Sequence, residues 1–296
     1  MNQFVLIVGS GLITAALLAV AGVGFTLQFS VTNVLNIAYG SIMTAAALVA
    51  YAVNTAGANL WVSGLVAAAT GATFSLAINR GVFRPFKGRR AGPFTLIILS
   101  LAMSLILENA LLIVGGPHFF SYGQLGQPSV RIEGVGFTPS QVVMVAVAGV
   151  LMFVVHAMQK WTKLGKAMRA TATNPELARS RGVRTAIVVD LAWVISGALC
   201  GLAGLFMGII VGAFNASTGS SFLVPIIAGV VLGGIGSPYG AMMGALIIGI
   251  VSEAAASIGG LSALKQLVAF AVLIGMLLLR PQGIFSSTAA ERGLAR

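Results

Sequence analysis

The chain has 296 residues, of which 58% are hydrophobic and only 8% are charged. Soluble domains are about 45–50% apolar and about 25% charged, so these few charges cannot cover the surface of a soluble protein of this length. The apolar content also excludes a disordered chain. The sequence therefore predicts an all-α, polytopic integral membrane protein, with residues 1–296 forming a single transmembrane domain.

Apolar runs long enough to cross about 30 Å of hydrocarbon need about twenty residues. A further run at 222–235 is Gly-rich and has only 14 residues, which is compatible with a half-helix, a re-entrant segment or a short crossing. We therefore expect a helical bundle of eight or nine spans, with a broken or re-entrant segment near 222–237. The eight long runs lie at about 4–24, 34–54, 60–79, 94–114, 139–158, 186–213, 236–258 and 262–280.

The net charge of +11 is concentrated beside the apolar runs. Segment 80–92 carries five basic residues and no acid, segment 159–185 carries seven against one acid, and the tail after Leu279 carries three against one. Because Lys and Arg in short loops mark the cytoplasmic side, we expect these segments inside, and loop 115–138 and the N-terminus outside. Run 186–213 then ends outside while the tail lies inside, so an odd number of crossings must follow it. This favours 222–235 as a ninth crossing. Basic residues beside spans attract anionic lipid, so we expect membrane lipid and no nucleic acid as a partner.

The cytoplasmic segment 159–185 encodes a short helix with defined ends. Asn174 is a good N-cap, Pro175 suits the first helical position, and Gly182 supplies a stop. An acid in the first turn and bases in the last complement the helix dipole. The helix, about 175–181, is either a docking element for a cytoplasmic partner or a juxtamembrane helix lying on lipid. The docking residues would be Asn174, Pro175, Glu176, Leu177, Ala178, Arg179, Arg181 and Gly182.

No nucleotide-binding or metal-binding motif is visible in the chain. The phosphate-binding pattern G-x-x-x-x-G-K-[ST] is absent, because the only Gly–Lys pair, Gly165–Lys166, lacks the first glycine. If transport is driven by ATP, the ATPase is therefore another chain. The single cysteine, Cys200, excludes an intramolecular disulfide, and neither His118 nor His156 has a partner cluster. We expect no metal and no cofactor.

Four motifs, in order across nearly the whole chain, resemble those of one transporter family. They are Val34-Leu-Asn-Ile-Ala-Tyr-Gly40, the loop pattern from Gly165 to Gly182, the Gly-rich stretch from Val230 to Gly244, and the ending Leu279-Arg-Pro-Gln-Gly-Ile-Phe285. Together they look like the permeases of branched-chain amino-acid ABC transporters, and like the shorter, H-type permease in particular. One departure is Tyr39, where many members carry His.

The resemblance implies a heteromeric importer in the bacterial inner (plasma) membrane. Its other parts would be a second related permease subunit, cytoplasmic ATP-binding subunits and an extracytoplasmic substrate-binding protein. The helix at 174–182 would then be the coupling helix seated in a groove of the ATPase. Leucine, isoleucine and valine are the cargo that the resemblance implies, while other amino acids, amides or urea stay open. So does the choice between a homodimer and a heterodimer of permeases.

Polar and helix-breaking residues within the apolar runs are candidates for the translocation path. The glycines beside Pro238 would break a helix, which membranes tolerate only against protein or a water-filled cavity. The polar segment 26–37 either forms a loop at the cytoplasmic end or caps a half-helix deeper in the bilayer. Glu108 is an intramembrane acid and so either makes a helix–helix hydrogen bond or lines the path. The candidates are Asn33, Asn36, Tyr39, Glu108, Gly233, Gly234 and Gly236.

Other features of the apolar runs predict packing rather than transport. Glycines recur at helical spacing from Gly197 to Gly212 and from Gly236 to Gly244, which favours close approach of helix backbones. Asp190, near the inner end of its run, is expected to reach the interface or to pair with Arg184.

The leading hypothesis is the membrane subunit of an ATP-coupled importer for branched-chain or related hydrophobic amino acids, with no catalytic residue of its own. The alternative is a self-contained secondary transporter or channel for small amino acids or amides. It would need coupling-ion sites, and only Glu108 is suitable. An intramembrane enzyme would need a motif such as G-x-S-x-G or H-E-x-x-H, and neither occurs. The aromatic residues of loop 115–138 suit either a membrane-interface belt or a binding-protein contact.

Overall fold

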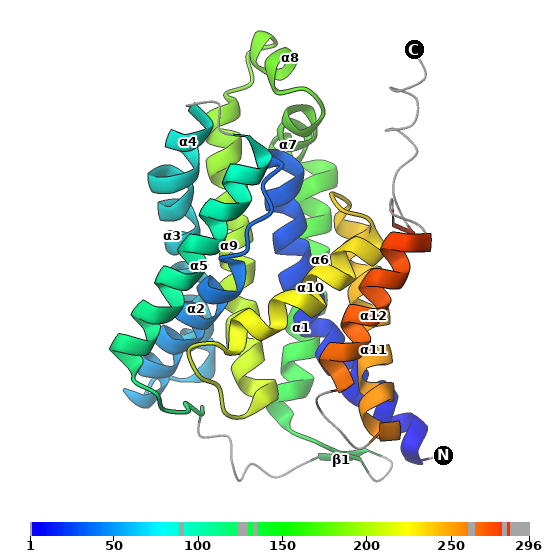
Figure 1. Ribbon diagram of the computed structural model, residues 1–296. Helices are drawn as coiled ribbons and strands as arrows, with labels where there is room; N and C mark the ends of the chain where they lie inside the picture. Colours follow the sequence, from blue (N-terminus) through cyan, green and yellow to red (C-terminus); the bar gives the residue numbers. More distant parts are fainter. Residues whose placement is uncertain are drawn as a thin grey trace.

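Helices that run between the two ends of an elongated bundle make up most of the structure (Figure 1). The computed structural model describes residues 2–88, 92–122, 130–132, 135–259, 264–279 and 283–284. Within these ranges, the one sheet is an antiparallel hairpin of β1 (Val130–Ile132) and β2 (Val135–Phe137). The helical fold class is therefore confirmed, with this short hairpin as an addition.

Each expected run contains a helix, although several helix ends differ from the expected ones. The first half of the chain forms α1 (Asn2–Thr32), α2 (Tyr39–Thr55), α3 (Leu60–Ile78), the π-helical turn η1 (Asn79–Phe83), α4 (Arg84–Gly88) and α5 (Pro93–Gly115). The second half forms α6 (Pro139–Trp161), α7 (Lys163–Thr173), α8 (Pro175–Ser180), α9 (Thr185–Val211), α10 (Thr218–Gly233), α11 (Pro238–Gly259) and α12 (Leu264–Leu279).

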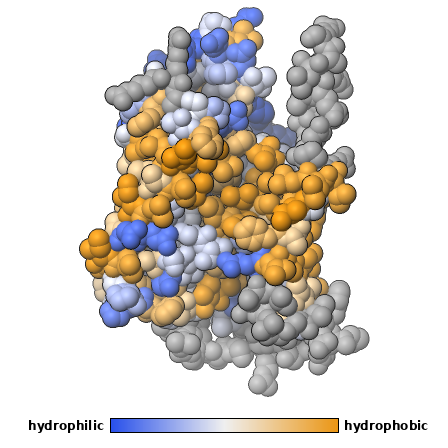
Figure 2. All heavy atoms as spheres, in the orientation of Figure 1, coloured by the Kyte–Doolittle hydropathy of each residue, from blue (hydrophilic) through white to orange (hydrophobic). Residues whose placement is uncertain are grey.

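Six helices of the described chain are long and apolar enough to cross a membrane, by length and composition. The expected count of eight or nine is not reached by this criterion, because α2, α10 and α12 have only 17, 16 and 16 residues. The six are Ile7–Thr32, Leu60–Gly88, Pro93–Gly115, Pro139–Trp161, Thr185–Val211 and Pro238–Ser257. A band of hydrophobic side chains crosses the middle of the face in Figure 2, and hydrophilic side chains gather at the end that carries α8.

Two of the expected basic segments are more helical than the sequence indicated. Segment 80–92 was expected as a loop, but η1 and α4 continue α3 as far as Gly88. Segment 159–185 contains a second helix, α7, whose N-cap Thr162 accepts a hydrogen bond of 3.1 Å from the Gly165 amide. Arg89, Arg90 and the tail after Leu279, apart from residues 283–284, lie outside the described residues.

Glycine contacts bring helices of the core together at backbone distance. A Cβ added to Gly201 on α9 would meet the backbone of Ala67 on α3. On the other side of the bundle, a Cβ on Gly244 of α11 would meet the Gly229 backbone of α10. The packing role expected for the glycine stripes is confirmed at these contacts, whereas Gly212 ends α9 with a φ of 75°.

The chain breaks between α1 and α2, inside the bundle. Helix α1 extends eight residues beyond its expected end, to Thr32, and Asn33 then takes a φ of 55°. The irregular segment 33–38 is held by Ser100 of α5, whose hydroxyl accepts from the Ile37 amide and donates to the Leu35 carbonyl, each at 3.2 Å. Helix α2 then starts at Tyr39, which is buried. Helix α2 thus starts inside the bundle, but its N-cap is Ala38 and no side chain caps it, so the capping role expected for the polar residues of 26–37 is not observed.

Candidate functional site

Helix α8 forms at the expected place and with the expected cap. The Asn174 side-chain oxygen accepts hydrogen bonds from the amides of Glu176, at 3.1 Å, and Leu177, at 2.9 Å. Pro175 occupies the first turn, where no intrahelical donor is needed. Gly182 takes a φ of 83°, which favours glycine and ends the helix.

Helix α8 lies at the tip of one end of the molecule, beyond α7 (Figure 1). Its Ala178 is buried, while Leu177 is 56% exposed although it is a large apolar residue. Below it, Met168 of α7 packs with Val188 and Ala192 of α9 in a separate small hydrophobic cluster. The two short helices therefore rest on α9 as one unit that presents α8 to the surroundings.

A cavity of about 490 Å³ lies beneath α8. It is bounded by the end of α1, by η1 and α4, by α7 and α8 and by the start of α9, and Pro175 and Arg179 of α8 belong to its wall. Asp190 also lines it and accepts hydrogen bonds from Asn79, at 2.9 Å, and Arg80, at 2.8 Å. The expected pairing of Asp190 with Arg184 is therefore wrong: the η1 turn places Arg80 beside it.

The break before α2 contains several buried polar groups. Tyr39 donates its hydroxyl to the Ala21 carbonyl of α1, at 2.9 Å. Gln28 accepts a hydrogen bond of 3.3 Å from Ser196 of α9. Asn36 is 1% exposed, and neither polar atom of its side chain has a partner among the described residues. Such an unsatisfied amide is costly in a core, so Asn36 stays a candidate residue for the translocation path.

The second break, between α10 and α11, lies where the sequence placed it. Helix α10 ends at Gly233, and Gly234 and Gly236 take φ values of 108° and 92° before Pro238 starts α11. A Cβ on Gly233 would meet the backbone of Gly240. These glycines thus let α10 and α11 form a tight helical hairpin.

Glu108 on α5 contacts the start of α10. Its carboxylate accepts a hydrogen bond of 3.0 Å from the hydroxyl of Ser220. A cavity of about 320 Å³ lies between α5 and the segment 215–217 that leads into α10. Its wall consists of Leu105, Glu108, Asn109, Leu112, Gly116, Pro117, Asn215, Ala216 and Ser217.

A polar stripe on α5 brings two of the candidate regions together. Ser100 holds the break at 33–38, Ser104 lies 2.8 Å from Ser41 of α2, and Glu108 binds Ser220 of α10. The spacing of four places all three on one face of α5. The spacing is visible in the sequence, but the two serines lie within an apolar run, and the sequence gives no sign of the helices that they contact. The break at 234–237 has no such contact with the stripe among the hydrogen bonds of the described residues.

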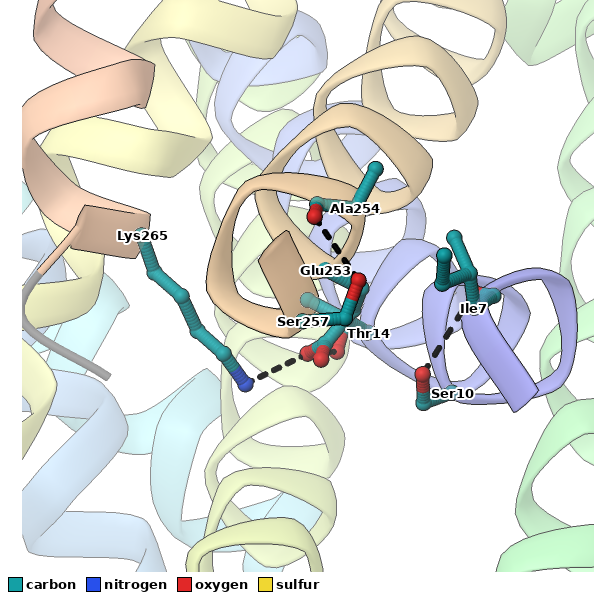
Figure 3. A network of polar contacts seen from close by, with 7 residues as sticks. All are labelled: Ile7, Ser10, Thr14, Glu253, Ala254, Ser257 and Lys265. Atoms are coloured by element: carbon teal, nitrogen blue, oxygen red, sulfur yellow. Dashed lines mark hydrogen bonds and ion pairs between the residues drawn. The ribbon is translucent and has the colours of Figure 1, made fainter. Parts of the chain in front are cut away.

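The third acid on a long apolar helix, Glu253, is part of an ion pair. Its Oε1 on α11 accepts a hydrogen bond of 2.8 Å from Thr14 of α1 and lies 2.6 Å from Nζ of Lys265 on α12. Figure 3 shows the three side chains together. These contacts connect three helices. Among the described residues there are two ion pairs, and they involve Asp190 and Glu253. Of the three acids on long apolar helices, Glu108 is therefore the one without an ion pair in the described part of the chain.

The long apolar helices and the hydrophobic band define a multi-pass helical membrane protein. The family described as "Branched-chain amino acid transport system / permease component" matches residues 7–277, and the chain belongs to this family. It is 27% identical to the high-affinity branched-chain amino acid transport system permease protein BraD of Pseudomonas aeruginosa, over 96% of each chain.

Two other relatives extend the comparison. A probable branched-chain amino acid transport permease protein LivH of Methanocaldococcus jannaschii is 30% identical, over 94% of this chain and 91% of the relative. The fructose import permease protein FruF of Bifidobacterium longum is 26% identical, over 80% of this chain and 66% of the relative. No solved structure matches the chain significantly.

Proposed function

We propose that this chain is the membrane-spanning permease subunit of an ATP-binding-cassette importer that moves branched-chain or related hydrophobic amino acids across the bacterial inner membrane. Its membership of the permease family supports transport, and the near full-length match to BraD supports the cargo class. The observation that carries the coupling to an ATPase is α8, a capped helix at the tip of the molecule with an exposed Leu177.

The proposed topology has nine crossings in one domain. In this proposal each of α1, α2, α3, α5, α6, α9, α10, α11 and α12 counts as one crossing, although α2 and α10 start inside the bundle. With the basic coupling loop 159–185 in the cytoplasm, α12 ends on the same side and α1 begins outside. Loop 115–138 is then external, where the proposed substrate-binding protein docks.

The proposed coupling surface is α8 and its caps. Leu177 supplies an apolar contact for a groove in the ATPase, and Arg179 also lines the cavity beneath α8. Because α8 shares the wall of that cavity with α1, η1 and α9, a movement of α8 would also change the position of these helices relative to one another. The residues of the surface are Asn174, Pro175, Glu176, Leu177, Ala178, Arg179, Arg181 and Gly182.

The proposed partner in the membrane is a second, related permease subunit. Helix α5 exposes Ile113 and Val114 by 84% and 83%, and Phe94 by 74%, so most of its surface is free to contact a partner or lipid. The polar stripe of α5 lies on its other face, against α2 and α10. The proposed path therefore follows α5 and the helix breaks. Its residues are Asn33, Asn36, Tyr39, Glu108, Gly233, Gly234 and Gly236.

Site-specific crosslinking tests this proposal. The single native cysteine, Cys200, is buried, so a cysteine introduced at Leu177 is the reactive one. In membranes that contain the whole importer, we expect Leu177→Cys to crosslink to the ATPase subunit. The control is Ala56→Cys, an exposed position after α2 at the end of the molecule away from α8, and it is not expected to crosslink. If no ATPase accompanies the chain, or Leu177→Cys gives no product, the ATP-coupled function is wrong. Transport that continues without any ATPase supports the secondary transporter or channel.

A further inference from the structure

Three acids of the described chain lie on long apolar helices, and their surroundings differ. Asp190 and Glu253 each contact a cation, Arg80 at 2.8 Å and Lys265 at 2.6 Å. Glu108 has no ion pair among the described residues. A charge inside a membrane is costly unless it is paired or faces a polar cavity. The structure therefore leaves the charge of Glu108 to be balanced by something that enters its cavity.

The cavity beside Glu108 has a suitable size and chemistry for a small amphipathic molecule. Its volume of about 320 Å³ lies at the lower end of the range of about 300–1,000 Å³ for small-ligand sites. The wall contains no Lys, Arg or His, and it combines Glu108 and Asn109 with the apolar Leu105 and Leu112. The ammonium group of an amino acid would lie against Glu108 and its apolar side chain against Leu105 and Leu112, with its carboxylate turned towards the side-chain amide of Asn109.

The hydrogen bond from Ser220 fixes the carboxylate without neutralising it. Ser220 donates to Oε2 of Glu108 at 3.0 Å, and no described residue donates to Oε1. The second oxygen is thus available to a donor in the cavity. Figure 2 shows hydrophilic side chains interrupting the hydrophobic band over α5 and the start of α10, on the half away from α8. The polar site is therefore open on one face of the molecule.

We propose that the cavity between α5 and segment 215–217 binds the ammonium group of an amino-acid cargo, with the Glu108 carboxylate as its counter-ion. The inference rests on the proposed import function and names the residue that recognises the cargo. An ammonium group donates to Oε1 while Ser220 keeps Oε2, and charge-assisted bonds of this kind are about twice as strong as neutral ones. A neutral sugar has no group that needs this charge, so the site favours amino acids as cargo.

Uptake by the complete importer in proteoliposomes tests the proposal. Glu108→Gln removes the charge but keeps an oxygen that accepts from Ser220, so the fold is retained. We expect leucine uptake to fall by about tenfold or more, the effect of about 1.4 kcal/mol, while the substrate-binding protein still stimulates ATP hydrolysis. Glu108→Asp is expected to recover part of the uptake. Uptake by Glu108→Gln at the wild-type rate would overturn the inference.

The controls separate this inference from the proposed function. Thr95→Ala alters an exposed polar side chain on the same helix, α5, outside the cavity wall, and we expect its uptake to stay within about threefold of wild type. If the wild-type complex itself fails to take up leucine with ATP, the proposed import function fails. If the wild type transports and Glu108→Gln transports equally well, only the assignment of Glu108 fails.

A labelling experiment tests the ammonium recognition itself. Ser217 lines the cavity, and the native Cys200 is buried, so Ser217→Cys gives one reactive thiol there. In the complete importer, leucine is expected to slow maleimide labelling of this thiol, whereas 4-methylpentanoate, which lacks the ammonium group, is not. Equal protection by both compounds, or protection that persists with Glu108→Gln, would overturn the proposal.

Discussion

The hydroxyl groups of Ser41 on α2 and Ser104 on α5 lie 2.8 Å apart, in the middle of a polar stripe that joins α5 to the bundle. Both side chains are buried, and Ser41 also lies 3.2 Å from the Ser104 carbonyl oxygen, to which it donates. Because α5 is largely exposed elsewhere, this pair and its neighbours on the stripe fix how α5 sits against α2.

Replacing this pair is expected to have a small and non-additive effect. With Ser104→Ala, Ser41 still has the carbonyl of residue 104 as an acceptor, so the free energy of unfolding should fall by about 1 kcal/mol or less. Ser41→Ala removes the donor, and the double variant should be no less stable than the less stable single variant, because the residues are in contact. Thermal unfolding in detergent measures this. An additive loss would show that the two hydroxyls do not interact.

The glycine contact between α9 and α3 is expected to be intolerant of any side chain. A Cβ at Gly201 would meet the Ala67 backbone, whereas a Cβ at Gly149 on α6 would have no atom within 4 Å. Gly201→Ala should therefore lower stability by about 1–3 kcal/mol. Gly149→Ala should leave it unchanged or raise it by up to about 1 kcal/mol. Equal unfolding temperatures for the two variants would contradict this packing.

Cys200 is expected to be unreactive in the folded protein. Its side chain is buried on α9, and its Sγ lies 3.2 Å from the Tyr39 carbonyl oxygen. A membrane-permeant maleimide should label less than about a tenth of the native chain, and most of it after unfolding in detergent, because reaction requires access to the thiol. Rapid labelling of the native protein would mean that α9 and the break before α2 are open.

The proposed topology predicts which residues are accessible from each side of the membrane. Cysteines at Ser180, in α8, and at Ala56, after α2, lie at opposite ends of the molecule, and both positions are exposed. A membrane-impermeant maleimide should label Ala56→Cys in intact cells and Ser180→Cys only after the membrane is permeabilised. The reverse pattern would invert the proposed orientation.

Local features of the structure could be predicted from the sequence, and long-range contacts could not. Helix α8 was predicted because Asn174, Pro175 and Gly182 determine its ends within a few residues. The partner of Asp190 was predicted wrongly, because Arg184 is near in sequence while Arg80, 110 residues away, is near in space. The short helices were the hardest to count as spans. Helices α2 and α10 start inside the bundle, where neighbouring helices can satisfy their polar ends, so the length of the apolar run does not show whether they cross.

The same limit applies to the candidate site. Glu108 could be selected as an intramembrane acid, but its contact with Ser220 joins residues 112 positions apart. Its lack of a cation could be recognised only after the neighbours of Asp190 and Glu253 were known. The stripe of Ser100, Ser104 and Glu108 was visible as a spacing of four, and it becomes informative because its members contact the break at 33–38, the start of α2 and the start of α10.

ATP-driven leucine uptake by the complete importer, with and without the substitution Leu177→Asp, tests the central claim most directly. Leu177 is exposed on α8, so a charge there should leave the permease folded but exclude α8 from an apolar groove, because burying an unpaired charge is costly. With the permease still purified in normal amounts, uptake and coupled ATP hydrolysis should both fall by about tenfold or more. Wild-type uptake by Leu177→Asp would contradict the claim that this permease is driven by an ATPase through α8.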